Sequence, residues 1–314
     1  MRSVPWLISL LAAAATLCKD DSRISFLVHA FSTAASPSKV IHSIDNIPCL
    51  ENQIYVSNID QSITILEATL EGQDKLVDEV LMLDEEIEEG DDDNVVREDP
   101  YGSVLWPAAL SVSEHITNES FLDSDGGNND DQNKPSLLEL GTGTGLVALA
   151  ASASNKYSSI LATDYETVPL KLLDAAYLLN QSDENPTTTT PITTSLFDIC
   201  DLSIPLPPAD IVCAADILYE KSTGIALAKR CIEALERGSR VVIGCSPGRP
   251  GRPAFLEELR RLNPSLKDVN FVDVEGTTCT GERNSLICGE GSTSISDEPE
   301  VLLVALMDLT PDCM

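Results

Sequence analysis

A glycine-rich turn between an apolar strand and an apolar helix constrains the fold of this 314-residue chain more than any other feature. In residues 137–153, LLELGTGTGLVALAASA, a buried strand runs into Gly141, Gly143 and Gly145, and a helix begins immediately afterwards. Backbone amides at the start of such a helix face an approaching ligand, and glycine allows close approach because it has no Cβ. The segment therefore predicts a strand–turn–helix unit with a ligand site at the turn.

Strands and helices alternate in the same way along the C-terminal half of the chain. Apolar strand patterns occur at residues 136–141, 159–165, 192–198, 209–218, 239–245, 269–276 and 300–309. Helical apolar spacing occurs between them, at residues 145–154, 168–180, 222–236 and 253–262. This alternation predicts an α/β fold that is Rossmann-like, with a seven-stranded, mostly parallel sheet and helices on both faces.

The segments ahead of the turn are less regular. Residues 53–59 and 62–71 alternate with a period of two, which predicts a pair of strands. Residues 84–93 contain eight acidic residues and are expected to form a solvated loop, or alternatively a docking strip for a basic protein segment. Pro107 stands where the first turn of a helix tolerates proline, and the polar residues 118–135 predict a surface insertion.

The N-terminus has the composition of a targeting segment. Residues 4–18 form an apolar stretch of secretory-signal length, although a buried helix is the alternative interpretation. Residues 25–43 contain no acid and are rich in small residues, as in a transit peptide. The junction of Ala30 and Phe31 resembles the bipartite presequence of algae with complex plastids. We therefore expect residues 1–45 to direct import into an organelle, a plastid in the first instance, with a cytoplasmic location as the alternative.

The charge of the chain excludes several classes of partner. It carries 20 Lys and Arg against 51 Asp and Glu, a formal net charge of −31. Such a surface repels nucleic acids and anionic membranes and attracts cationic partners. The nine cysteines form no Cys-x-x-Cys pair and the three histidines lie far apart, so we expect neither a disulfide framework nor a metal site.

Glycine alone leaves four interpretations of the turn: a site for a nicotinamide cofactor, for another nucleotide or for S-adenosylmethionine, or a tight turn without a ligand. Three further features narrow the choice. The third glycine of the dinucleotide fingerprint would fall at Leu146 and is missing. Glu139 lies two residues before the first glycine, where a carboxylate would repel a pyrophosphate and attract a cation. Asp164 ends the next strand, where it can accept both hydroxyls of a ribose. These features favour a nucleoside with a cationic end and no phosphate.

Four segments in this order resemble one family, the seven-β-strand S-adenosylmethionine-dependent methyltransferases, in the protein lysine methyltransferase branch called methyltransferase family 16. They are YGSVLWPAAL, LLELGTGTGL, ATDY and ADILY, and the resemblance covers roughly residues 100–310. It implies a sheet whose final hairpin is reversed. Together with the composition of the N-terminal part, it divides the chain into the presequence at residues 1–45, N-terminal strands with an acidic linker at residues 46–99, and a methyltransferase domain at residues 100–314.

The resemblance assigns a cofactor site for S-adenosyl-L-methionine. Trp106 is expected to line the pocket, with a core anchor as the equal alternative. Gly141, Thr142 and Gly143 are expected under the methionine part, while Glu139 attracts its cation. Asp164 is expected to hold the ribose, with a turn residue at the strand end as the weaker alternative.

The adenine side departs from the family pattern, which has Asp-Trp after the third strand. Here the order is Phe197 and then Asp198, within SLFDIC. Either Phe197 covers the adenine and Asp198 accepts from its exocyclic amine, or the alignment slips by one residue.

The ADILY segment, which begins at Ala215, matches the family's Asp-x-x-Tyr motif through Asp216 and Tyr219. Ala215 is expected beside the cofactor. Asp216 and Tyr219 are expected to orient a neutral lysine nitrogen for in-line displacement while its proton leaves through water. Capping of the next turn by Asp216 and simple packing of Tyr219 are the alternatives.

The resulting hypothesis is a monomeric enzyme that methylates a side-chain nitrogen of a protein with an accessible lysine. It would bind no nucleic acid and insert stably in no membrane once the presequence is removed. The alternatives are a methyltransferase acting on a small molecule and a protein that binds S-adenosylmethionine without turnover.

Overall fold

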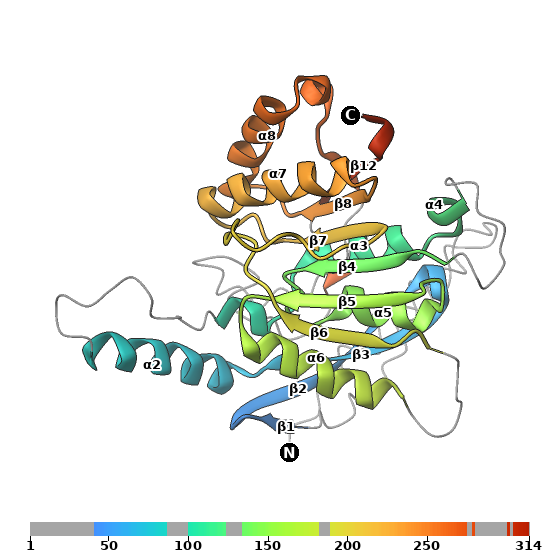
Figure 1. The fold of residues 1–314 in the computed structure, drawn as a ribbon. Helices are drawn as coiled ribbons and strands as arrows, with labels where there is room; N and C mark the ends of the chain where they lie inside the picture. The colour runs from blue at the N-terminus through green and yellow to red at the C-terminus, as the bar shows by residue number, and fades with distance from the viewer. Residues whose placement is uncertain are drawn as a thin grey trace, which may run out of the picture. The chain divides into compact units, whose positions relative to one another are not determined.

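Seven strands form one sheet in the order β6-β5-β4-β7-β8-β12-β9 (Figure 1). The computed structural model describes residues 41–86, 100–123, 134–181, 189–274, 278–279, 300–301 and 304–313. The strands of the sheet are β4 (Ser136–Leu140), β5 (Ser159–Asp164), β6 (Ile192–Leu196), β7 (Ile211–Ala215), β8 (Arg240–Cys245), β9 (Val272–Val274) and β12 (Val304–Leu309). The predicted alternation of strands and helices is therefore confirmed.

One strand, β12, runs antiparallel to its neighbours in the sheet. β4, β5, β6, β7 and β8 pair in parallel, whereas β12 is antiparallel to both β8 and β9. This is the reversed final hairpin that the resemblance implied. A separate pair of two-residue strands, β10 (Thr278–Cys279) and β11 (Glu300–Val301), lies between β9 and β12 in the chain.

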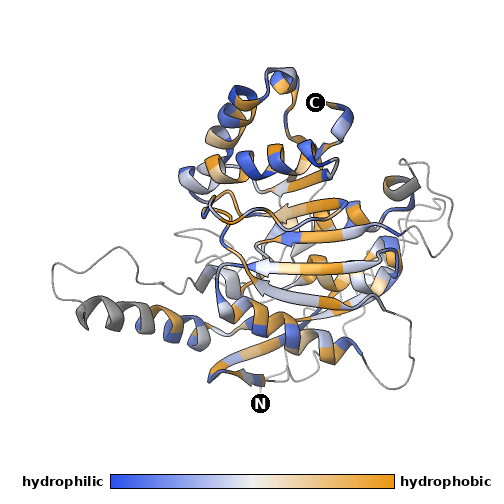
Figure 2. Ribbon diagram, viewed as in Figure 1, coloured by the Kyte–Doolittle hydropathy of each residue, from blue (hydrophilic) through white to orange (hydrophobic). Residues whose placement is uncertain are grey.

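Alternate residues of the strands face two hydrophobic cores. Leu137 of β4 and Cys213 of β7 belong to the core with α3 (Pro107–Thr117), α5 (Leu146–Ser154) and α6 (Thr167–Asn180). Leu138 and Val212, one residue away, belong to the core with α7 (Lys221–Glu236) and α8 (Gly251–Leu262). Figure 2 shows the hydrophobic stretches on the central strands that this arrangement requires. Helices on both faces are thus confirmed, because both sides of each central strand are apolar.

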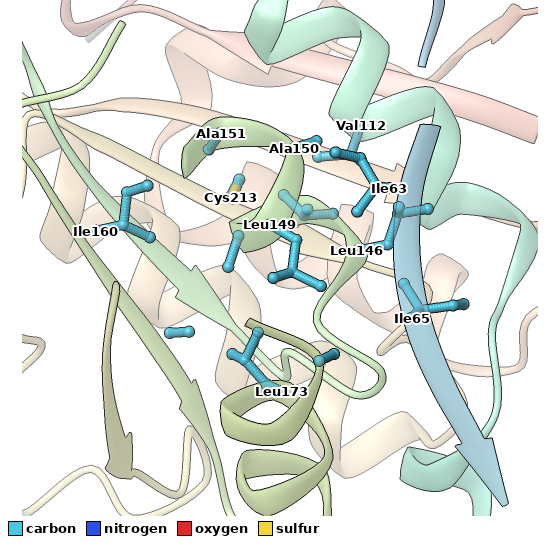
Figure 3. Packing of buried hydrophobic residues seen from close by; sticks show 14 of the residues in the cluster. Ile63, Ile65, Val112, Leu146, Leu149, Ala150, Ala151, Ile160, Leu173 and Cys213 are labelled. Atoms are coloured by element: carbon cyan, nitrogen blue, oxygen red, sulfur yellow. The ribbon is translucent and has the colours of Figure 1, made fainter. Parts of the chain in front are cut away.

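Three N-terminal strands extend the first of these cores. β1 (Ile41–Ile44), β2 (Ile47–Val56) and β3 (Gln61–Ala68) form an antiparallel sheet, which confirms the predicted strand pair. Ile63 and Ile65 of β3 are buried in the same cluster as Leu146 and Leu149 of α5 (Figure 3). Full burial of each such side chain contributes about 1.5–3 kcal/mol. The N-terminal strands therefore help to hold α5, the helix that follows the glycine turn.

The predicted strand at residues 62–71 ends earlier than expected. β3 stops at Ala68, and α2 (Leu70–Glu86) begins after Thr69. The Thr69 hydroxyl accepts a hydrogen bond from the Gly72 amide at 3.0 Å, which satisfies one of the free amides of the first helical turn. This side-chain cap starts a helix where the alternating pattern predicted continued strand.

Helices occupy the first residues of the acidic run and of the polar insertion. Residues 84–86 are the last residues of α2, so the expected loop was wrong for them, because glutamate favours a helix once one has begun. Residues 87–99 lie outside the described structure. In the insertion, α4 (Glu119–Asp123) starts after Asn118, whose side chain accepts from the Ser120 amide at 2.9 Å. Residues 124–133 also lie outside the described structure.

Short 3-10 helices complete the described chain: η3 (Ser57–Ile59), η4 (Pro100–Ser103), η6 (Pro264–Asp268) and η7 (Pro311–Cys313). α3 begins at Pro107, as predicted. The targeting prediction falls almost entirely on residues 1–40, which lie outside the described structure, and β1 occupies residues 41–44. The domain boundaries at residues 45 and 99 stay predictions. Across the described ranges, no helix combines the length and the apolar character needed to span a membrane.

Candidate active site

The glycine turn lies between β4 and α5, and two of its glycines serve packing within the protein. Gly141 and Gly145 have φ angles of +69° and +81°, which favour glycine. A Cβ at Gly141 would lie 2.5 Å from a methyl carbon of Ile217, and one at Gly145 would lie 2.4 Å from a methyl carbon of Leu173. These two glycines are therefore required by the protein's own packing, and their contact with a ligand stays a prediction.

Gly143 differs from its two neighbours. Its φ angle is +52°, yet a Cβ there would meet nothing closer than the Gly102 carbonyl oxygen in η4, at 3.4 Å. Its amide donates to Oδ2 of Asp164 at 3.1 Å. Gly143 is thus the glycine of the turn whose side is open, and η4 reaches over it from a distant part of the chain.

Glu139 lies beneath the turn and is almost completely buried, with 1% of its surface exposed. Its Oε2 accepts from the Thr142 hydroxyl at 2.8 Å and from the Ala148 amide in the first turn of α5 at 3.1 Å. Burial raises the pKa of Glu139 to about 8, although these two hydrogen bonds oppose the rise; the negative charge of Asp164 adds to it. The carboxyl group therefore braces the turn and the start of α5 from below.

Asp164 ends β5 beside the turn and is buried. Oδ2 accepts from the Gly143 amide, and Oδ1 accepts from the Glu166 amide at 3.3 Å. A carboxylate has about four lone-pair sites and can accept from several donors at once. The prediction that Asp164 holds a ribose stays open, and its position at the carboxyl end of β5 fits that prediction.

Trp106 stands immediately before α3 and is half-buried. Its indole Nε1 donates to the Tyr101 carbonyl oxygen at 2.8 Å, and the two rings lie 6.2 Å apart. The guanidinium carbon of Arg249 lies 4.3 Å from the centre of the indole ring. Trp106 is therefore held between η4 and the loop after β8.

Asp216 follows β7 directly, in a left-handed conformation with φ +59°. This conformation ends the predicted strand of residues 209–218 at Ala215. The Asp216 carboxylate is buried, and it accepts from the Ala108 amide at 2.9 Å, from the Ser246 amide and hydroxyl at 2.7 Å each, and from Arg249 Nε at 3.2 Å. These four donors occupy its lone-pair sites. The structure therefore supports a positioning role for Asp216, which ties α3 and the end of β8 to β7.

The loop between β7 and α7 carries the other motif residues. Ala215 is the last residue of β7 and is half-buried. Tyr219 has 36% of its surface exposed. Among the residues predicted to act on a substrate, Tyr219 is thus the one with an exposed side chain.

The two residues predicted at the adenine lie after β6. The Phe197 ring is buried in the core with α7, with the guanidinium carbon of Arg230 5.0 Å from its centre, and its amide donates to the Asp164 carbonyl oxygen at 2.8 Å. Asp198 is exposed, and its Oδ1 accepts from the Cys200 amide at 2.7 Å. The hydrogen bond from the Phe197 amide to Asp164 places the start of this loop next to the end of β5. Contacts of Phe197 and Asp198 with a cofactor stay predictions.

Arg249 and Ser246 are site residues that the sequence analysis missed. They belong to the segment CSPGRPGRP, which follows β8 and brings Arg249 to Trp106 and Asp216. One signal could have found them: β8 is parallel to β7, so the segments after both strands meet at one edge of the sheet.

The family of the chain is shown by comparison with known proteins. Residues 92–262, more than half of the chain, match the family model described as "Lysine methyltransferase". The chain belongs to this family of methyltransferases. The methyltransferase uses S-adenosylmethionine as its methyl donor, and its Rossmann-like fold agrees with that assignment. A search of curated protein sequences finds no significant match.

Three solved structures are among those similar to this methyltransferase. TehB from Haemophilus influenzae is 14% identical with a TM-score of 0.37, covering 61% of this chain and 66% of that chain. A TehB-like SAM-dependent methyltransferase from Corynebacterium glutamicum is 15% identical with a TM-score of 0.35, covering 63% and 97%. CrArsM, an arsenic(III) S-adenosylmethionine methyltransferase from Chlamydomonas reinhardtii, is 11% identical with a TM-score of 0.37, covering 65% and 73%.

The residues around the turn fit this methyl donor. The open side of Gly143 leaves a cradle that a Cβ would fill. Asp164 places a carboxylate at the carboxyl end of β5, and carboxylates accept hydrogen bonds from ribose hydroxyls. Gly143 and Asp164 would thus hold a cationic nucleoside, with Trp106 at the side of the turn. The attraction expected between Glu139 and the cation is not supported, because this carboxyl group is buried, accepts hydrogen bonds from Thr142 and Ala148, and has its pKa raised to about 8 by burial.

Proposed function

We propose that this methyltransferase transfers a methyl group to the side-chain nitrogen of a lysine in a protein substrate. The match to the lysine methyltransferase model over residues 92–262 carries the proposal. The net charge of −31 supports it, because an acidic surface attracts lysine-rich segments at long range. Exposed Tyr101 and Tyr219 support it as well, since they lie on the segments that carry Trp106 and Asp216 and remain accessible to a large substrate.

The reaction needs a neutral amine held in line with the methyl group. When bound, S-adenosylmethionine supplies a methyl group on a sulfonium, whose C–S bond breaks as the N–C bond forms. A lysine with a pKa of about 10.4 must first lose a proton, which costs about 4.6 kcal/mol at about pH 7. In our proposal the Tyr219 hydroxyl orients the nitrogen, the proton leaves to water, and the catalytic gain comes from alignment.

Asp216 acts one step further away in this proposal. Its carboxylate holds the Ala108 amide at the start of α3, as well as Ser246 and Arg249 after β8. These contacts fix the backbone that leads to Tyr219. Asp216 is thus a positioning residue, and Tyr219 is the proposed catalytic residue.

Transfer of labelled methyl groups into the proteins of a cell lysate tests the proposal. Label should enter protein, and mass spectrometry should find it on lysine. Asp164→Asn should weaken S-adenosylmethionine binding by about 1.5–3 kcal/mol, because hydrogen bonds to a charged acceptor are lost. Asp174→Asn is the matched control, since Asp174 is an aspartate on α6 whose side chain accepts only from Thr194 among the contacts described.

Two results would overturn the proposal. Label that enters only the small-molecule fraction would indicate a small-molecule acceptor. Tight binding of S-adenosylmethionine with no transfer into any fraction would indicate a protein that binds the cofactor without turnover. Tyr219→Phe separates the role of the hydroxyl, because it should lower kcat and leave cofactor binding unchanged.

A further inference from the structure

A groove at the start of α8 carries three arginines in a chain that is otherwise strongly acidic. The groove has a volume of about 660 Å³, and its lining includes Arg249, Arg252, Arg260, Pro250, Pro253 and Leu256. We call it the arginine groove. Glu257 also lines it and is exposed. Three arginines against one glutamate reverse the balance of the whole chain, which has 20 basic and 51 acidic residues.

Two of these arginines have no carboxylate partner in the described structure. The guanidinium of Arg252 stacks over Phe271, with its central carbon 4.5 Å from the ring centre. Arg260 donates from Nη2 to the Val269 carbonyl oxygen at 3.0 Å, while its Nε is buried and has no hydrogen-bond partner. By contrast, the neighbouring Arg261 has a carboxylate partner, because its Nε pairs with Glu258 at 2.6 Å. A buried donor without an acceptor is costly, and Arg260 is one of the residues that line the groove.

The groove adjoins the active site. Arg249 lines it and also contacts Trp106 and Asp216. The first residue of α8, Gly251, donates its amide to the Leu218 carbonyl oxygen at 3.0 Å. A Cβ at Gly251 would lie 2.2 Å from the Glu220 carbonyl oxygen, so α8 begins directly against the loop that carries Tyr219. The arginine groove therefore lies next to the loop that carries Tyr219.

We propose that the arginine groove binds an acidic side chain of the protein substrate, close to the lysine that is methylated; this rests on the proposed function above. Guanidinium groups match carboxylates in a bidentate geometry. Pro250, Pro253 and Leu256 add apolar surface, which suits a peptide better than a bare inorganic anion. A net charge of −31 disfavours polyphosphates and nucleic acids, whereas one carboxylate on a lysine-bearing substrate meets less repulsion. The groove thus selects among lysines by their acidic neighbours.

Binding of labelled synthetic peptides to the full chain, followed by fluorescence anisotropy, tests this proposal. Two lysine-containing peptide pools are compared, identical except that every Glu in one is Gln in the other. The Glu pool should bind more tightly, by about tenfold, and Arg252→Gln and Arg260→Gln should each remove most of that difference. Glu257→Gln should strengthen binding of the Glu pool, because it removes a like charge. Arg261→Gln is the matched control and should change nothing, since Arg261 already pairs with Glu258.

S-adenosylmethionine binding by each variant shows that the variant is folded. A loss of peptide binding then cannot be attributed to unfolding. Equal binding of the two pools would overturn the proposal. So would inorganic phosphate or a phosphoserine peptide displacing the Glu pool at lower concentration than a free Glu peptide, because the groove would then be a phosphate site. If the Glu pool binds as expected but no lysine is methylated, the proposed function fails and the groove stands. If lysines are methylated equally in both pools, the groove proposal fails and the function stands.

Discussion

The guanidinium carbon of Arg249 lies 4.3 Å from the centre of the Trp106 ring. This contact joins the loop after β8 to the residue before α3, and a cation over an aromatic face contributes about 0.5–1 kcal/mol when partly exposed. Both residues stand at the carboxyl edge of the sheet, where ligands of open α/β sheets bind. The fluorescence of Trp106 therefore reports on the site.

Replacing Arg249 should expose the indole ring. The chain has two tryptophans, so Trp106 is the sole one in a Trp6→Phe background. Arg249→Gln in that background should shift the Trp106 emission to longer wavelength and lower the free energy of unfolding by about 1–2 kcal/mol, since both the stacking and the Asp216 contact are lost. Unchanged emission would mean that the stacked geometry does not persist in solution. Arg261→Gln serves as the control, because Arg261 pairs with Glu258.

Substitution of Asp216 should lower the stability of the fold rather than remove a group that acts on the substrate. Asp216→Asn retains a side chain that tolerates the left-handed backbone, yet it removes the charge opposite Arg249 and should cost about 2–3 kcal/mol in urea unfolding. Asp216→Ala should cost more, because backbone strain of about 1–2 kcal/mol is added. If Asp216→Asn instead keeps full stability and cofactor binding but loses turnover, the carboxylate contacts the substrate amine, as the sequence motif predicted.

Substitutions at two glycines of the turn should distinguish a role in folding from a role in cofactor binding. Gly141→Ala should lower the unfolding free energy by about 2–4 kcal/mol, since strain and the collision with Ile217 add together. Gly143→Ala should lower the unfolding free energy by about 1–2 kcal/mol, because it adds backbone strain but no collision. It should nevertheless abolish S-adenosylmethionine binding measured by calorimetry. Gly238→Ala is the matched control: its φ is +86° and nothing lies within 4 Å of its added Cβ. Tight cofactor binding by Gly143→Ala would place the ligand elsewhere.

The raised pKa of Glu139 predicts a specific pH dependence of stability. Burial raises this pKa to about 8, whereas an unfolded glutamate titrates near about 4.3. Between these values the folded protein binds more protons than the unfolded chain, so stability should fall as pH rises, by at most about 1.4 kcal/mol per pH unit, and level off above about pH 8. In Glu139→Gln this slope should disappear.

Urea unfolding of the wild type and Glu139→Gln across this pH range isolates the effect. The Asp308 carboxyl provides the contrast: burial opposes its ionisation, but hydrogen bonds from His115 and Arg240 outweigh burial and hold its pKa below the usual value. Its contribution to stability is therefore complete well below neutral pH and is lost only as pH falls through that lowered pKa. Parallel pH curves for the two proteins would show that Glu139 ionises normally.

Much of the fold was predictable because it depends on local patterns. Apolar residues repeating with the period of a strand or a helix placed the parallel strands and α3, α5, α6, α7 and α8. The glycine turn and Asp164 were predictable for the same reason, since each stands at a fixed offset from the end of a strand. Local capping already shows the limit, because the Thr69 hydroxyl starts α2 inside a segment whose pattern indicated strand.

The sequence by itself thus determined the alternation of strands and helices after the glycine turn, the edge of the sheet where the site lies and the family of the chain. Only the tertiary structure decided what each site residue does. The donors to Asp216 come from Ala108, Ser246 and Arg249, which are far from it in sequence, and their approach fills the carboxylate that the motif alone left free. Side-chain roles of this kind depend on which donors packing brings within hydrogen-bond distance, and no periodicity along the chain encodes that.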